Sequence, residues 1–376
     1  MQGGARYGYA LLWVVLLANL IAMLVQYLAA KLGIVTGKNL PEMIRAHFPR
    51  PFMWCMWVQA EIMAMATDIA EFLGAAIALY LLFGVPPAVA GLITALLAFG
   101  ILGLQSRGYR RFEVAITALL AVVLAGFIYE TLRVGPSVPD SLRGFLPGVP
   151  SAGALYLAVG IVGATVMPHV VYLHSALVNA RTACTTDQER SRRLHFGRFD
   201  VIVALGLAGA VNIAMLAVAA RLFHVPGLSA LSTLQQAHDG LARLAGGTAA
   251  LVFSIALLAS GLSSSSVGTY AGQIVMAGFT TFRVPLLARR AVTMVPALIV
   301  LAVGMNATSA LVLSQVVLSF GIPFALVPLV MFTSRRDLMG SHANGRPVSF
   351  LAWTSVCIIA VANTALLWQQ LSGRDG

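Results

Sequence analysis

The residues best suited to chemistry in this chain are a methionine and a histidine on either side of a proline, within a long apolar stretch. The stretch reads Ala164-Thr165-Val166-Met167-Pro168-His169. Proline has no backbone N–H, so the carbonyl of Ala164 loses its helical hydrogen bond and the helix breaks. Inside a bilayer, a freed carbonyl lines a cavity or binds something. The thioether of Met167 and the imidazole of His169 are both metal ligands, so we predict an intramembrane binding site at this break.

The two side chains at the break differ in what they allow. A thioether favours later transition metals over Ca²⁺ and Mg²⁺, which prefer hard oxygen ligands, and the alternative for Met167 is ordinary packing. His169 can serve as a metal ligand, as a proton acceptor or gate element, or as a polar residue satisfied by a neighbouring helix. His174 lies five residues further on, about 140° around the helix, so we expect it to be structural.

A second group of ionisable residues lies in the apolar stretch 52–83. Asp68 and Glu71 have the i, i+3 spacing that places two carboxyls on one helix face, with Glu61 two turns before Asp68. Acids inside a membrane are costly and by default mark ion paths or proton relays. The alternative is a buried acidic pair balanced by Arg289 or Arg290, and these arginines are either topology anchors or the far end of the relay.

Two side-chain amides also lie in apolar segments. Gln315 precedes Gly321 and Pro323, which are expected to bend its helix, and its carbonyl oxygen could ligate a cation. Asn212 is a similar, weaker case. For both, a hydrogen bond between helices is the alternative. The run Ser263–Ser266, between Gly261 and Gly268, predicts close helix packing.

The elements that must position these residues are membrane helices. Hydrophobic residues make up 59% of the 376 residues and charged residues 10%, with a mean hydropathy of +0.88. Such a composition indicates an all-α polytopic membrane protein. We predict ten complete transmembrane helices, at 9–30, 52–83, 86–104, 112–132, 152–180, 200–223, 247–277, 288–306, 309–333 and 348–370.

The basic residues alternate between the loops that join these segments. Of the 24 Lys and Arg, 18 fall in one set of loops and 6 in the other. Because positive charge is retained on the cytoplasmic side, the larger set is predicted to be cytoplasmic and both ends of the chain external. Membrane topology thus explains the net charge of +11, and no nucleic-acid partner is expected.

Little in the sequence favours an enzyme. No HExxH motif, P-loop or CxxC pair is present, and the three cysteines are scattered. The one long polar loop, predicted at about 182–198, is too short for a nucleotide-binding or catalytic domain. We therefore expect a non-enzymatic membrane protein that needs no cofactor.

Taken together, these residues make the chain similar to the Nramp family of divalent-metal transporters, in its bacterial manganese-importing branch. The resemblance extends along nearly the whole chain. It covers Gly3–Tyr9, Lys31–Ile34, Asn39–Glu42, the Asp68 and Glu71 helix, the Met-Pro-His break, Gly261–Ser265 and the Gln315 helix. The break is the most specific of these motifs.

The resemblance implies a LeuT-type fold of two inverted five-helix repeats with discontinuous first and sixth helices. The expected division is 1–134 for the first repeat, 150–333 for the second and 348–376 for an extra C-terminal helix. By the same resemblance, Met167 and the carbonyl of Ala164 hold the metal and His169 belongs to the site and its gate. Gln315 completes coordination in occluded states and Asn212 lines the route. Asp68 and Glu71 form a proton path with His169 toward Arg289 and Arg290.

The chain departs from the family pattern at its start. The family's first broken helix carries an Asp-Pro-Gly-Asn motif, whereas Met1-Gln2-Gly3-Gly4 is similar to the segment just after that motif. We therefore expect only a remnant of the broken first helix. If the site lacks that aspartate, a dication has no anionic ligand there and should bind poorly.

The predicted function is proton-coupled import of Mn²⁺ and Fe²⁺ by alternating access in a bacterial cytoplasmic membrane. Its partners would be metal ions, protons and lipid. One alternative is a truncated or degenerate relative that binds or senses metal without coupled transport. Another is a LeuT-type carrier of an organic solute.

Overall fold

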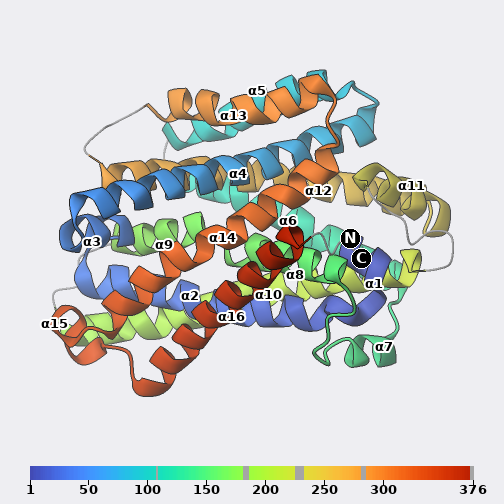
Figure 1. Ribbon diagram of the computed structural model, residues 1–376. Coiled ribbons are helices and arrows are strands. Elements are labelled where there is room, and N and C mark those ends of the chain that lie inside the picture. Colours follow the sequence, from blue (N-terminus) through green and yellow to red (C-terminus); the bar gives the residue numbers. More distant parts are fainter. Residues whose placement is uncertain (107–108, 181–185, 225–232, 281–284, 373–376) are drawn as a thin grey trace.

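The computed structural model describes residues 1–106, 109–180, 186–224, 233–280 and 285–372, and all regular structure in these ranges is helical. The long helices form one bundle, in which the last two along the chain run obliquely to most of the others (Figure 1). They are α2 (Leu12–Thr36), α4 (Arg50–Phe83), α5 (Pro87–Ser106), α6 (Tyr109–Val134), α10 (Asp187–Phe223), α12 (Gly247–Phe279), α13 (Leu286–Val303), α14 (Ala307–Ser334) and α16 (Arg346–Leu371).

Shorter helices complete the bundle. They are α1 (Gln2–Tyr7), α3 (Leu40–His47), α7 (Val138–Arg143), α8 (Ala152–Val166), α9 (Pro168–Ala180), α11 (Leu234–Leu244) and α15 (Arg336–Met339). In Figure 1, α3 and α15 lie at one end of the bundle and α7 and α11 at the other. Both marked chain ends lie in the half away from α3 and α15 (Figure 1).

Each of the ten predicted apolar segments coincides with helix. Within the described residues, eight helical stretches are long and apolar enough to cross a membrane, and Pro87–Ile101 is a shorter apolar helix. The segment predicted at 9–30 becomes regular α-helix only at Leu12. A 3₁₀ turn over Gly8–Leu11, with Gly8 at a φ of 57°, separates α1 from α2 and breaks the helical path.

The prediction of a polar loop at about 182–198 is wrong over most of its length, because α10 already begins at Asp187. Thr186 and Glu189 form a capping box, in which each side chain accepts a hydrogen bond from the backbone N–H of the other residue. Arg190 pairs with Asp187 one turn away. These local bonds extend the helix beyond its apolar part, and residues 181–185 lie outside the described residues.

The centre of the bundle is built around α4, α12 and α14. The largest cluster of buried apolar side chains joins α2, α3, α4, α12, α14 and α16. Such burial is not a hydrophobic driving force in lipid, so close packing and hydrogen bonds between helices hold these elements together. The described acidic residues of α4 therefore lie in the interior of the bundle, where they need partners.

At the predicted bend in α14, a backbone carbonyl is hydrogen-bonded by a side chain of the last helix, α16. Pro323 has no N–H with which to bond the carbonyl of Ser319, one turn before it. Asn363 of α16 donates its side-chain N–H to this carbonyl at 2.9 Å and accepts the hydroxyl of Ser319 at 2.8 Å. A side chain on α16 thus satisfies the carbonyl that proline leaves free in α14.

Candidate functional site

The predicted break at Pro168 is confirmed. α8 ends at Val166, α9 begins at Pro168, and Met167 between them has a φ of 31° and a ψ of 96°. It is the one non-glycine residue with positive φ among the described residues. Since Pro168 cannot donate, the backbone geometry leaves the carbonyl of Ala164 without its usual helical partner. Met167 itself is half-buried.

A cavity of about 400 Å³ lies beside this break, between α1, α8, α10, α12 and α14. It brings together three of the residues predicted for metal binding, namely Ala164, Asn212 and Gln315. Ser260 and Thr165 add hydroxyl groups to an otherwise largely apolar wall. Met167 and His169 are not among the lining residues, so the α8 lining ends at Thr165, two residues before Met167.

The side-chain amide of Gln315, on α14, contains a polar atom without a hydrogen-bond partner among the described residues. Its side-chain oxygen is buried and has no hydrogen-bond partner among the described residues. A buried amide oxygen without a partner costs free energy, on the order of 1–3 kcal/mol, unless something else bonds it. Because Gln315 also lines the cavity, a turn of this side chain would bring an oxygen suited to a cation into it.

The helices that carry Ala164 and Gln315 touch through their backbones. A Cβ placed on Gly163 would lie 1.9 Å from the carbonyl oxygen of Gln315 and 2.9 Å from the backbone nitrogen of Ser319. Only glycine permits this approach between α8 and α14. The contact fixes the position of Ala164 relative to Gln315.

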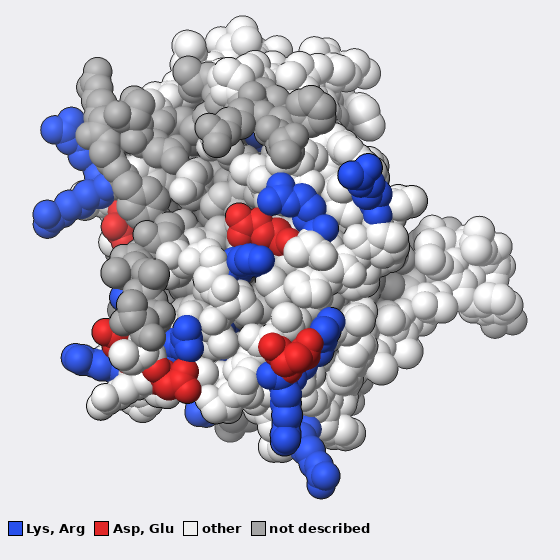
Figure 2. All heavy atoms as spheres, turned by 90° about the vertical axis from the view of Figure 1, so that its left-hand side faces the viewer, with Lys and Arg blue, Asp and Glu red and all other residues white. Residues whose placement is uncertain are grey.

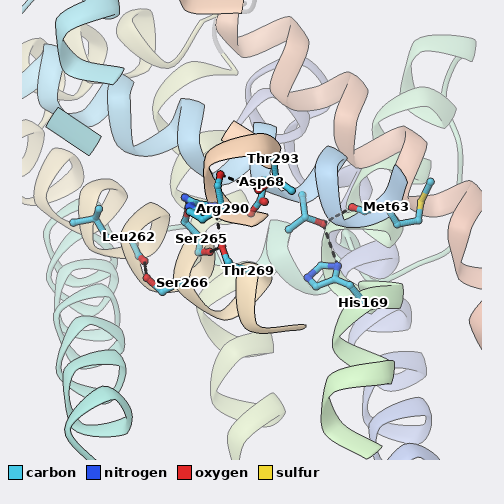
Figure 3. Close-up of polar contacts among 10 residues, drawn as sticks. Met63, Asp68, His169, Leu262, Ser265, Ser266, Thr269, Arg290 and Thr293 are labelled. Carbon is cyan, nitrogen blue, oxygen red and sulfur yellow. Dashed lines mark hydrogen bonds and ion pairs between the residues drawn. The ribbon is translucent and has the colours of Figure 1, made fainter. Parts of the chain in front are cut away.

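His169 lies on the other side of the break, almost fully buried, and faces α4. Its Nδ1 is 3.1 Å from the hydroxyl of Thr67, which also lies 3.0 Å from the carbonyl of Met63 (Figure 3). A hydroxyl has one proton, and Thr67 donates it to the Met63 carbonyl. Hydrogen bonding therefore assigns the Nδ1–H as the donor to Thr67, which leaves Nε2 with the lone pair of the neutral ring.

The neighbour of Thr67 on α4 is Asp68, which pairs with an arginine from α13. Arg290 donates to a carboxylate oxygen of Asp68 at 2.8 Å, and both side chains are buried. Arg290 also donates to the hydroxyl of Thr269 at 3.0 Å and to that of Ser265, both on α12 (Figure 3). Three helices thus meet at one guanidinium.

Arg289 takes a different partner from its neighbour in sequence. It donates two hydrogen bonds to Glu61 on α4, and it lies against Gly272 of α12, where a Cβ would come within 2.4–2.8 Å of the guanidinium. The two arginines predicted as one end of a relay therefore form two separate ion pairs. Glu71 belongs to neither pair, and its Oε2 is buried without a hydrogen-bond partner among the described residues.

Several contacting residues were not singled out from the sequence. Ser265 lies in the serine run interpreted as close packing, yet its hydroxyl binds Arg290. The sequence around Thr67 and Thr269 carries no signal that predicts their contacts with His169 and Arg290. The predicted structural role of His174 agrees with its 2.8 Å contact to Gln26 on α2.

Within the described residues, histidine, cysteine and carboxylate side chains do not come together as a metal-binding cluster. In the described part of the chain, no group of three or more such side chains could hold a metal ion. The described cavity lining includes no carboxylate either. A cation in this cavity would be held by carbonyl, amide and hydroxyl oxygens, with the sulfur of Met167 at the adjacent break.

Comparison with solved structures first defines the class of protein. The inward-facing structure of Mhp1 aligns over 96% of this chain with a TM-score of 0.55 and 16% identity. MhsT in complex with L-phenylalanine aligns over 96% with a TM-score of 0.57 and 13% identity. At such identities the likeness concerns the fold alone. The chain is an all-helical, multi-pass membrane protein with the LeuT-type inverted-repeat fold.

Closer relatives then define the family. The family profile described as "Natural resistance-associated macrophage protein-like" matches residues 1–369. The divalent metal cation transporter MntH of Deinococcus radiodurans is 49% identical over 373 residues, which cover 99% of this chain and 86% of that protein. MntH of Aeromonas hydrophila is 51% identical over 369 residues, covering 98% and 90%. The chain belongs to the Nramp family, whose named relatives are transporters rather than enzymes.

A solved structure supports the same assignment. The manganese transporter of Eremococcus coleocola aligns with a TM-score of 0.87 and 34% identity, over 100% of this chain and 83% of that one. The expected Nramp membership and LeuT-type fold are both confirmed.

Proposed function

We propose that this chain imports divalent transition metal ions, Mn²⁺ and Fe²⁺, across a bacterial cytoplasmic membrane, coupled to inward movement of protons. The observation that carries the proposal is the helix break at Met167 beside a cavity lined by Ala164, Asn212 and Gln315. The names of the similar proteins, divalent metal cation transporter and manganese transporter, support the same substrate class.

The metal would meet a set of mostly neutral ligands. The cavity of about 400 Å³ has room for a dication with six waters, roughly 200 Å³ at about 30 Å³ per water. The carbonyl of Ala164 and the side-chain oxygen of Gln315 would replace some of these waters. Neutral oxygens do not distinguish Mn²⁺ from Ca²⁺ strongly, so discrimination would rest on the sulfur of Met167.

Protons would follow a separate set of groups that begins next to the break. His169 contacts Thr67, whose neighbour Asp68 pairs with Arg290. A proton on Asp68 would cancel the charge that holds Arg290, so protonation there would loosen α13 and α12 from α4. Glu71, one turn further along α4, would accept the proton next. This sequence of groups connects the metal region to movable helix contacts.

In alternating access, the half-helices α8 and α9 on either side of Met167 would move independently of each other. α8 is fixed to α14 through the Gly163 contact, whereas α9 contacts α4 through His169 and Thr67. The break between them lets each half-helix follow its own neighbour. Movement of α4 could then open one side of the site while the other stays closed.

The test is metal uptake into proteoliposomes that contain this chain. Mn²⁺ and Ca²⁺ uptake would be measured at two external pH values, for the wild type, Met167→Ala and Met331→Ala. Met331 is on α14 and 41% exposed, so it serves as a matched control. We expect Mn²⁺ uptake to rise at the lower external pH. Met167→Ala should first lose the preference for Mn²⁺ over Ca²⁺, and Met331→Ala should behave as the wild type.

Two results would refute the proposal in distinct ways. Mn²⁺ binding without uptake would favour a relative that binds or senses metal without transport. Absence of both Mn²⁺ binding and Mn²⁺ uptake would favour an organic solute as cargo, and unchanged selectivity in Met167→Ala would separately remove the sulfur from the site.

A further inference from the structure

A second pocket lies far from the helix break, at the corner where α3 turns into α4. Its volume is about 370 Å³. The end of α12 closes it from the side, through Phe279 and Thr280. The other lining residues are Arg45, Phe48, Arg50, Met53 and Trp54.

Among the described residues that line this pocket, the charged ones are all basic. Arg45 and Arg50 are both exposed, and none of the described lining residues is acidic. Among the described residues, neither arginine forms an ion pair. One guanidinium nitrogen of Arg45 lies 3.5 Å from the carbonyl of Thr280, which directs this side chain toward the end of α12. The remaining guanidinium N–H groups suit an anion with several oxygens, such as a phosphate.

The apolar surroundings identify the side from which such an anion would come. Trp54 is 41% exposed and Phe52, next to the pocket on α4, is 42% exposed. Phe52 stacks on Phe48 with ring centroids 4.9 Å apart. An exposed tryptophan at the end of a membrane helix is typical of the level of lipid headgroups, and the exposed phenylalanine adds apolar surface beside it.

The pocket also lies on the side that the Lys and Arg distribution assigns to the cytoplasm. Figure 2 looks onto the end of the bundle that carries α3 and α15, where several basic side chains lie, some of them beside acidic ones. Anionic lipids of the cytoplasmic leaflet are attracted to such clusters. A free phosphate would use the two arginines but would leave the exposed aromatic residues unused.

We propose that this pocket binds the phosphate group of an anionic phospholipid of the cytoplasmic leaflet. Arg45 and Arg50 hold the phosphate oxygens. Trp54 and Phe52 contact the glycerol and the first part of the acyl chains. The lipid thereby joins the start of α4 to the end of α12, the two helices that also carry Asp68 and the ligands of Arg290.

Native mass spectrometry of the purified full chain in detergent tests this site. The probes are phosphatidylglycerol, phosphatidylcholine with the same acyl chains, and soluble glycerol phosphate as competitor. The variants are Arg45→Gln/Arg50→Gln and, as matched control, Arg336→Gln/Arg346→Gln. The control removes two exposed arginines that start α15 and α16 and do not line the pocket. Size-exclusion profiles and Mn²⁺ binding report whether each variant is folded.

The wild type should bind one phosphatidylglycerol more tightly than the others and in preference to phosphatidylcholine. Arg45→Gln/Arg50→Gln should weaken this binding by about tenfold or more, since each arginine near an anionic surface contributes on the order of 1 kcal/mol. The control should keep it, and glycerol phosphate should not displace the lipid. Equal loss in both variants would show general charge attraction and overturn the site. Displacement by glycerol phosphate would overturn the lipid as its source.

Discussion

Substitution of Gly163 by alanine tests whether the contact between α8 and α14 controls the site. The added Cβ would lie 1.9 Å from the carbonyl oxygen of Gln315 and 2.9 Å from the backbone nitrogen of Ser319. Both are backbone atoms inside a helix, so neither can rotate away as a side chain would. The two helices must separate instead.

The size of the separation follows from the contact distance. A carbon and a carbonyl oxygen approach to about 3.3 Å, so the helices must move apart by roughly 1.4 Å. Overpacking of this kind costs about 1–3 kcal/mol. The same movement carries Ala164 away from Gln315, and misplacement of binding groups by about 1 Å can lower a rate by about a hundredfold. We expect Gly163→Ala to lower both the unfolding temperature and Mn²⁺ uptake, the latter by at least about tenfold.

The control is the same substitution one turn earlier. A Cβ on Gly160 would lie 3.6 Å from the nearest atom, a methyl group of Val316, which is an ordinary contact. Uptake into proteoliposomes and thermal unfolding in detergent would be compared for the two variants. If Gly163→Ala transports and unfolds like Gly160→Ala, the backbone contact does not hold the site together and the reasoning fails.

Three further substitutions test other contacts. Arg290→Met should lower the free energy of unfolding by about 3–5 kcal/mol, because Asp68 becomes an unpaired buried carboxylate, whereas Asp68→Leu/Arg290→Met should recover most of it. Thermal unfolding measures this, and a double variant no more stable than the single one would contradict it. Gln315→Glu should tighten Mn²⁺ binding at least about tenfold in calorimetry by adding a negative charge to a cavity whose described lining includes no carboxylate, and unchanged affinity would exclude this oxygen as a ligand. Asn363→Ala should cost about 1–3 kcal/mol, since the carbonyl of Ser319 loses its donor, while Thr364→Ala on the exposed face should cost little.

The helices and the break could be predicted because their causes are local. The ten apolar segments predict membrane helices from hydropathy alone. Pro168 interrupts one of these helices because it lacks a backbone N–H, whatever its tertiary contacts. The start of α10 was missed because the capping box of Thr186 and Glu189 lies in a polar stretch that hydropathy alone assigns to a loop.

The pairing of charges could not be predicted to the same degree. Asp68, Glu71 and two arginines were expected near one another, but adjacent residues on a helix point about 100° apart. Only the packing of α13 against α4 decides that Arg290 meets Asp68 while Arg289 meets Glu61.

The hydroxyl groups that bind the Arg290 guanidinium, those of Ser265 and Thr269, could not be predicted from the sequence. A serine or threonine in a membrane helix usually bonds a carbonyl of its own helix, as Ser266 does with Leu262. Nothing local separates such a residue from Ser265, which lies beside it and binds Arg290. The roles of Asn212 and Gln315 depend in the same way on helices that meet only in the folded chain.

The positive φ angle of Met167 sets the stability of the fold against the proposed function of the side chain. A φ of 31° belongs to a region that glycine enters freely and that a side chain enters at a cost of about 1–3 kcal/mol. Glycine would relax this residue, yet it would also remove the thioether sulfur from the interruption. The chain therefore holds its thioether in a conformation that works against its own folding, and an engineer who sought a hardier protein here would give up the sulfur that we propose selects the metal.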